Sequence, residues 1–263
     1  MRLVFLGTGG GGNPPIGIDR DAAGIIDRTS NALVVQPNYP EPPTLLIDAA
    51  PDIRMQWAAW REAPLQPDAM VLTHEHQDHL LGMGEFRRCV NRMPVYATPR
   101  TLDHLARFGE LMFASDPTLN LTPHALPERG EATIAGVTVE TVQLHHLVPV
   151  TGVIIRHGGK TFAHLSDTGP LVEPDVRAAI AGCDVLAVNT AFLHDTPQDD
   201  GPMAYAYQHH ISIPAAIRLA QEVGAKKLAL LHFSHTTPER ELQRIAAENP
   251  SVLIPKDGEA LDL

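Results

Sequence analysis

The chain has 263 residues, and its 31 Asp and Glu outnumber its 20 Lys and Arg, so the formal net charge at pH 7 is −11. An apolar fraction of 44% and a charged fraction of 19% exclude a disordered chain, which combines low hydrophobicity with high net charge. Proteins that bind long nucleic acids usually carry a basic surface, because neutralising phosphates supplies most of the affinity. We therefore expect no long nucleic acid as a partner.

The use of cysteine and the N-terminal residues narrow the setting. Cys89 and Cys183 are the two cysteines, which excludes a disulfide framework and a cysteine-rich zinc module. The apolar run near the N-terminus ends at a run of glycines and is too short for a signal peptide or a membrane span. We expect a cytoplasmic protein that contacts no membrane. Histidine is the unusual residue, with 14 copies that cluster.

Short apolar runs separated by turn residues predict strands in the first half of the chain. The expected strands cover residues 3–6, 32–35, 44–47, 69–72 and 95–97, with helices over 51–60, 78–88 and 100–108. Residues 109–130 are rich in proline and glycine and show little periodicity. We expect an irregular insertion or lid there.

The second half of the chain repeats this alternation. A hairpin is expected from strands 132–134 and 137–144, with its turn at Ala135 and Gly136. The remaining strands are expected at 150–156, 161–165, 185–188 and 228–231, with helices at 174–181, 213–223 and 238–247. No linker separates the halves, so we predict one α/β domain over residues 1–263. Its two mixed β-sheets would pack face to face with helices on the outside.

A dense set of polar side chains follows the strand predicted at 69–72. His74, His76, Asp78 and His79 lie within six residues. Loops at the ends of parallel strands hold such side chains rigidly. Residues i and i+2 of an extended loop face the same way, so His74 and His76 can share one metal ion. Asp78 and His79, which turn into the next helix, can serve a second ion. A polar loop with spare histidines is the less favoured interpretation.

The pattern His-x-His-x-Asp-His after a buried strand resembles the signature of the metallo-β-lactamase superfamily. The resemblance implies the αββα sandwich and three later ligands, His146, Asp167 and His232, each of which follows an apolar strand. His145 competes with His146, which we favour because it stands six residues before the glycine that opens the next strand. Asp167 could instead be a strand-end cap, although Ser-Asp-Thr matches the bridging aspartate of the family closely.

The resemblance implies a centre for two divalent metal ions. Seven side chains are its expected ligands: His74, His76, Asp78, His79, His146, Asp167 and His232. His74, His76 and His146 would hold one ion, and Asp78, His79 and His232 would hold the other. Asp167 would bridge the two ions. Imidazole and carboxylate groups suit zinc or manganese, and also iron or nickel. Because two divalent ions add positive charge, the acidic chain can still bind a small anionic substrate.

The surroundings of His210 resemble one branch of this superfamily. His210 precedes the helix predicted at 213–223 and the strand that leads to His232. This order is similar to that in transfer RNA processing endonucleases and PhnP-type cyclic phosphodiesterases, where the matching histidine stands near the scissile phosphate. The resemblance implies that His210 is a general acid, with Asp78 as the second candidate catalytic residue. Packing at a helix start is the alternative for His210, and His209 is the less favoured neighbour.

Two further segments resemble the same branch of the superfamily, and one segment differs from it. Residues 7–10 and 50–54 resemble PhnP-type and pyrroloquinoline quinone B-type proteins. Many relatives carry a Cys-rich loop that binds structural zinc, whereas residues 13–30 contain no cysteine, so this loop must be held otherwise. Asp48 and Asp52 could be partners of metal-bound imidazoles or caps. Phosphate contacts are conceivable for Arg28, Arg54 and Asn189, although surface or structural roles are favoured.

These features predict a dinuclear metal-dependent hydrolase. We expect a phosphodiesterase that attacks a small cyclic or nucleotide phosphodiester through a metal-bound hydroxide. A pyrroloquinoline quinone B-type biosynthesis protein, or a hydrolase of another ester or lactone, is the alternative. A non-enzymatic binding module is least favoured, because such proteins tend to lose ligands. A homodimer is implied by the resemblance alone, and the substrate-binding residues stay unknown.

Overall fold

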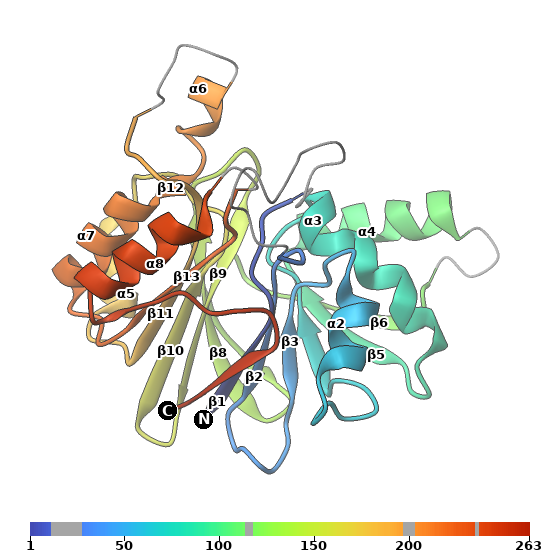
Figure 1. The fold of residues 1–263 in the computed structure, drawn as a ribbon. Helices are drawn as coiled ribbons and strands as arrows, with labels where there is room; N and C mark the ends of the chain where they lie inside the picture. The colour runs from blue at the N-terminus through green and yellow to red at the C-terminus, as the bar shows by residue number, and fades with distance from the viewer. Residues whose placement is uncertain (12–27, 114–117, 197–202, 235–236) are drawn as a thin grey trace.

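Strands from the N-terminal half form one β-sheet, which the final strand of the chain completes (Figure 1). The computed structural model describes residues 1–11, 28–113, 118–196, 203–234 and 237–263. The strand order is β15-β1-β2-β3-β4-β5-β6, and β3 to β6 run parallel. The bounds are β1 Arg2–Gly7, β2 Ala32–Gln36, β3 Leu45–Ile47, β4 Ala69–Val71, β5 Met93–Ala97, β6 Leu121–Ala125 and β15 Glu259–Asp262.

The second sheet has the order β14-β13-β11-β10-β9-β8-β7, and β12 pairs with β11. Strands β7 to β10 form an antiparallel meander, whereas β10, β11, β13 and β14 are parallel. The bounds are β7 Gly130–Ile134, β8 Val137–Leu144, β9 Val150–His157, β10 Lys160–Leu165, β11 Val185–Phe192, β12 Ile211–Ser212, β13 Leu228–Leu231 and β14 Val252–Leu253. The hairpin predicted around Ala135 and Gly136 is confirmed.

The central strands of both sheets are apolar on both faces, because each sheet is covered on both sides. In β1, Leu3 and Phe5 pack between the two sheets, whereas Val4 and Leu6 pack toward the helices of the first sheet. In β10, Phe162 lies in the central layer. This double burial explains why the strands read as continuous apolar runs rather than as alternating ones.

Helices cover the outer face of each sheet, as Figure 1 shows. The first sheet is covered by α2 Ile53–Ala59, α3 Gln77–Leu80, the 3-10 helix η1 Leu81–Arg88 and α4 Pro99–Met112. The second is covered by α5 Pro174–Ile180, α7 Ile213–Val223 and α8 Glu239–Glu248. The short α6, Met203–Ala206, stands away from the sheets near the end where β12 lies. The predicted α/β sandwich, two mixed sheets face to face with outer helices, is therefore confirmed.

Two sequence predictions need correction. The helix expected over 78–88 is α-helical only to Leu80 and continues as a 3-10 helix. A Cβ atom on Gly82 would lie 2.1 Å from the Ala50 carbonyl oxygen, so this glycine allows the close backbone approach. The irregular insertion expected over 109–130 is also wrong in part: α4 extends to Met112, and β6 occupies Leu121–Ala125.

Within the described residues, no helix combines the length and the apolar character that crossing a bilayer requires.

Candidate metal centre

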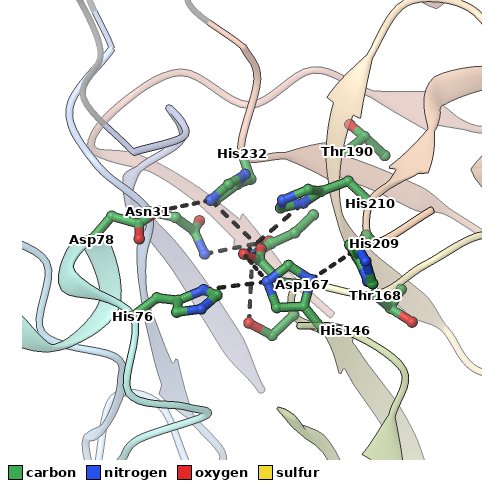
Figure 2. Close-up of polar contacts among 12 residues, drawn as sticks. Asn31, His76, Asp78, His146, Asp167, Thr168, Thr190, His209, His210 and His232 are labelled. Atoms are coloured by element: carbon green, nitrogen blue, oxygen red, sulfur yellow. Dashed lines mark hydrogen bonds and ion pairs between the residues drawn. The ribbon is translucent and has the colours of Figure 1, made fainter. Parts of the chain in front are cut away.

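Imidazole and carboxylate groups from both sheets meet at one end of the sandwich, as Figure 2 shows for most of them. Strands β4, β8, β10 and β13 each end within three residues of a member of this cluster. The members that follow them are His74, His146, Asp167 and His232, respectively. The strand ends therefore place donors that are far apart in the sequence at one point.

The donors form two groups that share one carboxylate. Side-chain donor atoms of His74, His76, His146 and Asp167 lie within 4.8 Å of one another, and so do those of Asp78, His79 and His232. Oδ2 of Asp167 lies 3.7 Å from Nε2 of both His74 and His79. Its Oδ1 lies 3.5 Å from Nε2 of His232. The structure thus brings together all seven predicted ligands in the predicted division, with Asp167 between the groups.

Hydrogen bonds behind the cluster fix the orientation of its imidazoles. Nδ1 of His79 lies 2.7 Å from Oδ2 of Asp48, and this carboxylate also accepts hydrogen bonds from the backbone N and Oγ1 of Thr73. Nδ1 of His146 donates to the His209 carbonyl oxygen at 2.6 Å. Both contacts direct Nε2 toward the centre of the cluster. Asp52 instead accepts a hydrogen bond from the Ser30 backbone N, so Asp48 alone of this pair supports an imidazole.

Thr73 supports His74 in the same way. The Thr73 hydroxyl has a single proton, which it donates to Asp48, so Nδ1 of His74 donates to Oγ1 of Thr73 at 3.0 Å. Sequence reasoning missed this residue and the His209 carbonyl. The position of Thr73 directly before His74 at the end of a buried strand is the signal that could have found it.

The burial and the mixed charges of the cluster shift its pKa values in opposite directions. Burial, together with the nearby His79, holds the pKa of His74 well below its usual value. Burial would raise the pKa of Asp167, but the imidazoles of His232 and His79 hold it well below the usual range. Burial would lower the pKa of His79, but the carboxylates of Asp48 and Asp167 hold it well above the usual range. The Asp167 carboxylate is therefore ionised at neutral pH.

These residues fit a divalent cation. Nε2 of His74 and Nε2 of His79 are buried and have no hydrogen-bond partner within the described part of the chain. An unpaired buried polar atom is costly, and both atoms face the Asp167 carboxylate. Imidazole nitrogen and carboxylate oxygen at these positions are suitable ligands for zinc and similar metals.

His210 lies beside the cluster, on the loop that precedes β12. Its Nδ1 is 4.0 Å from Oδ2 of Asp167, and its ring centroid is 4.7 Å from that of His146. Burial lowers the pKa of His210 to about 4. The His145 side chain is exposed and its ring lies near that of His209, 6.1 Å between centroids. The structure therefore brings His146 and His210 to the cluster and leaves the rings of His145 and His209 at its rim.

A cleft of about 300 Å³ opens over the donors. His76, Asp78, His146, Asp167, His210 and His232 line one part of it, and Gly10 and Gly11 another. A Cβ atom on Gly11 would come within 2.7 Å of Oδ2 of Asp78, so a glycine is needed where the backbone passes this carboxylate.

The residues considered for phosphate contact have structural roles or lie elsewhere. The Arg28 guanidinium is buried and bonded to Thr8, the Pro255 carbonyl oxygen and Glu239. Arg54 is exposed. Nδ2 of Asn189 donates to Oδ1 of Asp167 at 3.1 Å, which holds the shared carboxylate in place.

Comparison with known proteins agrees with this geometry. The model of the family "Beta-lactamase superfamily domain" matches residues 44–233. The octanoyltransferase of Porphyromonas gingivalis is 27% identical over 90% of this chain, which spans about half (47%) of that protein. A ribonuclease Z of Bradyrhizobium sp. is 26% identical, with 92% of each protein covered.

Solved structures share the fold over nearly the whole chain. A diphosphatase from the PhnP family has a TM-score of 0.80 at 23% identity, with 99% of this chain and 97% of that chain covered. Zn²⁺-bound PqqB from Methylobacterium extorquens has a TM-score of 0.81 at 23% identity, with both chains covered completely. Since the family model covers more than half of the sequence and its fold and donor cluster are present, the chain belongs to the metallo-β-lactamase superfamily.

Proposed function

We propose that this protein is a metal-dependent phosphodiesterase that hydrolyses a small cyclic or nucleotide phosphodiester. The placement of His210 carries the proposal. This imidazole lines the cleft, its side chain is 18% exposed, and its Nδ1 lies 4.0 Å from Oδ2 of Asp167, the carboxylate shared by both donor groups. A proton donor beside a two-group metal centre is the arrangement that cleavage of a P–O bond requires.

Two divalent ions, zinc or manganese, fit the two donor groups. His74, His76 and His146 would hold one, while Asp78, His79 and His232 would hold the other, with Asp167 between them. When bound, the ions activate a water molecule and stabilise negative charge on the phosphoryl oxygens. The neighbouring structure of Zn²⁺-bound PqqB favours zinc.

The side chains that line the cleft have separate roles in the reaction. Water adds to phosphorus and gives up a proton, the bond to the leaving oxygen breaks, and that oxygen must gain a proton. In the free protein His210 is a neutral ring, because burial lowers its pKa to about 4. The negative charge of a bound phosphodiester raises this pKa, so the ring takes up a proton when the substrate binds and then donates it to the leaving oxygen. Asp78 contributes as a ligand of the same ion as His232, since its Oδ2 lies 3.0 Å from Nε2 of His232.

Hydrolysis of bis(p-nitrophenyl) phosphate tests the proposal. Activity should disappear when a chelator removes the metal and return with zinc or manganese. His146→Ala should lower metal content, measured by mass spectrometry, whereas His145→Ala should not, because the exposed His145 lies outside the donor groups. Full activity after complete metal removal would contradict the proposal.

His210 needs a separate test, because its ring also belongs to a possible donor group with Asp167 and His232. We expect His210→Ala to lower kcat for a cyclic nucleotide, whose alkoxide leaving group needs a proton, by about 100-fold or more at unchanged metal content. The control is His209→Ala, since the contact of His209 with the cluster is made by its backbone carbonyl. A fall in metal content for His210→Ala would make His210 a ligand instead.

The kind of substrate that the protein hydrolyses distinguishes the proposed phosphodiesterase from its alternatives. The net charge of −11 disfavours a long RNA, although a ribonuclease Z is among the relatives. Precursor transfer RNA, thioesters and lactones, tested beside cyclic nucleotides on the metal-loaded protein, distinguish these reactions. Turnover of thioesters or lactones alone would favour the ester hydrolase alternative. Inactivity on every ester would favour a role similar to that of PqqB.

A further inference from the structure

The cleft over the metal donors also has a hydrocarbon lining. Leu147, Ala191, Phe192 and Ala206 border the same 300 Å³ space as the imidazoles and carboxylates. We call Leu147, Phe192 and Ala206 the apolar wall. Neither the donor groups nor the proton donor needs these side chains, so their presence requires a separate explanation.

Each part of the apolar wall has a fixed place in the fold. Phe192 is the last residue of β11, and its ring is stacked on that of Tyr207 with 3.8 Å between centroids. The Ala206 carbonyl oxygen accepts hydrogen bonds from the backbone N of both His209 and His210. Leu147 directly follows His146, whose ring is held by the His209 carbonyl. The wall is therefore anchored to the same segments as the site.

The apolar wall lies next to His210. The ring centroids of Phe192 and His210 are 6.2 Å apart, and those of His146 and His210 are 4.7 Å apart. In the proposed reaction, His210 donates its proton to the leaving oxygen. Because the rest of the leaving group is bonded to that oxygen, it must extend into the space beside His210, where the wall stands.

The wall distinguishes between kinds of leaving group. Leu147 is 49% exposed, so an apolar group that covers it removes hydrocarbon surface from water and gains binding energy. A charged group packed against Leu147, Phe192 and Ala206 would lose hydration, and these three side chains offer it no hydrogen-bond partner. We propose that the apolar wall binds the leaving alcohol and selects an uncharged aryl or alkyl group. This inference rests on the proposed phosphodiesterase function and specifies its substrate class.

Two phosphodiesters with similar leaving groups test the inference. Methyl 4-nitrophenyl phosphate has an uncharged leaving group, and methyl 3-carboxy-4-nitrophenyl phosphate has an anionic one. We expect kcat/KM of the metal-loaded protein to favour the uncharged ester by about tenfold or more. Leu147→Ala should reduce this preference by about tenfold, and Leu147→Lys should reverse it. Because both esters meet the same protein sample, differences in metal occupancy cancel in the ratio.

Leu65→Lys is the matched control. Leu65 is 84% exposed and lies outside the residues that line the cleft, so the same new charge should leave the ratio unchanged. A wild-type ratio near one, or an equal ratio in Leu147→Lys and Leu65→Lys, would overturn the apolar subsite while leaving the proposed function standing. Failure of the wild-type protein to hydrolyse either ester would instead overturn the proposed function and the subsite with it.

Discussion

Arg28 joins Thr8, directly after β1, to α8 and to the segment that carries His232, and its removal should destabilise the protein. Its guanidinium donates to Oγ1 of Thr8 at 2.6 Å, to the Pro255 carbonyl oxygen at 2.7 Å and to Glu239 at 3.0 Å. It also lies 4.9 Å from the ring centroid of Phe233, the residue after His232. The Arg28 side chain is only 5% exposed. These contacts fix Arg28 itself, whereas residues 12–27 of the cysteine-free segment lie outside the described residues.

The expected cost of Arg28→Met follows from the burial of the pair. Breaking a buried ion pair from one side typically costs about 3–5 kcal/mol, because the remaining charge is left without a partner. Glu239 is the first residue of α8, and the helix dipole offsets part of that cost. We therefore expect the free energy of unfolding, measured in urea, to fall by about 3 kcal/mol. Arg156→Met, which removes an exposed arginine paired with Glu140, should cost less than about 1 kcal/mol.

A double-mutant cycle tests the reasoning behind this number. Glu239→Gln removes the opposite charge, so in the Arg28→Met background it should cost much less than it does alone. The coupling energy between the two substitutions should be about 2 kcal/mol. Additive effects, or a loss below about 1 kcal/mol for Arg28→Met, would refute the idea that this buried pair stabilises the protein. Metal affinity should also fall in Arg28→Met.

Three further predictions concern Asp48, the bound metal and Asp184. Asp48→Asn should weaken metal binding by about 10- to 100-fold in a chelator competition, because the carboxylate orients His79, whereas Asp52→Asn should leave it unchanged. Chelation should lower Tm by about 5–10 °C when the metal had been present at about 100 times Kd; an unchanged Tm would argue against a metal that binds the folded state. Asp184 accepts hydrogen bonds from Lys226 and from the Thr161 backbone N, which lower its pKa. A carboxylate whose pKa is lower in the folded state stabilises the protein at pH values above its unfolded-state pKa, and this stabilisation is lost as the pH falls. Asp184→Asn should therefore lower the free energy of unfolding by about 1 kcal/mol from pH 7 to 5, and by progressively less below pH 4. A cost that is constant down to pH 3 would contradict the ionic origin.

Local sequence signals predicted the elements that have strong boundaries. The helix expected at 213–223 is found with the same bounds, because Ser212 caps its first turn and Gly224 ends it in the left-handed region. Strand β6 was missed because Pro123 lies inside it, and proline is tolerated at an edge strand, where one side needs no hydrogen bonds. Edge position is a property of the sheet and cannot be read from the segment itself.

The candidate site was also predicted only in part from the sequence. His74, His76, Asp78 and His79 were predicted from their spacing after a buried strand, whereas the three later ligands were predicted from the resemblance to the metallo-β-lactamase superfamily. The His209 carbonyl that holds His146 could not be predicted, because a backbone atom leaves no sequence signal. The apolar wall was missed for a related reason: Leu147 and Phe192 look like ordinary core residues until tertiary structure places them beside His210.

The pairing of β1 with β15 bears on how the protein is made. β1 precedes every other described strand in the chain, and its apolar residues Leu3 to Leu6 are buried in the finished sheet. Among the described residues, one edge of β1 pairs with β15, which is synthesised after every other described strand. Until β15 is made, a hydrophobic strand has an open edge that can pair with another chain. Deleting residues 259–263 would make this exposure permanent and should cause aggregation even though the metal centre lies at the far end of the sandwich.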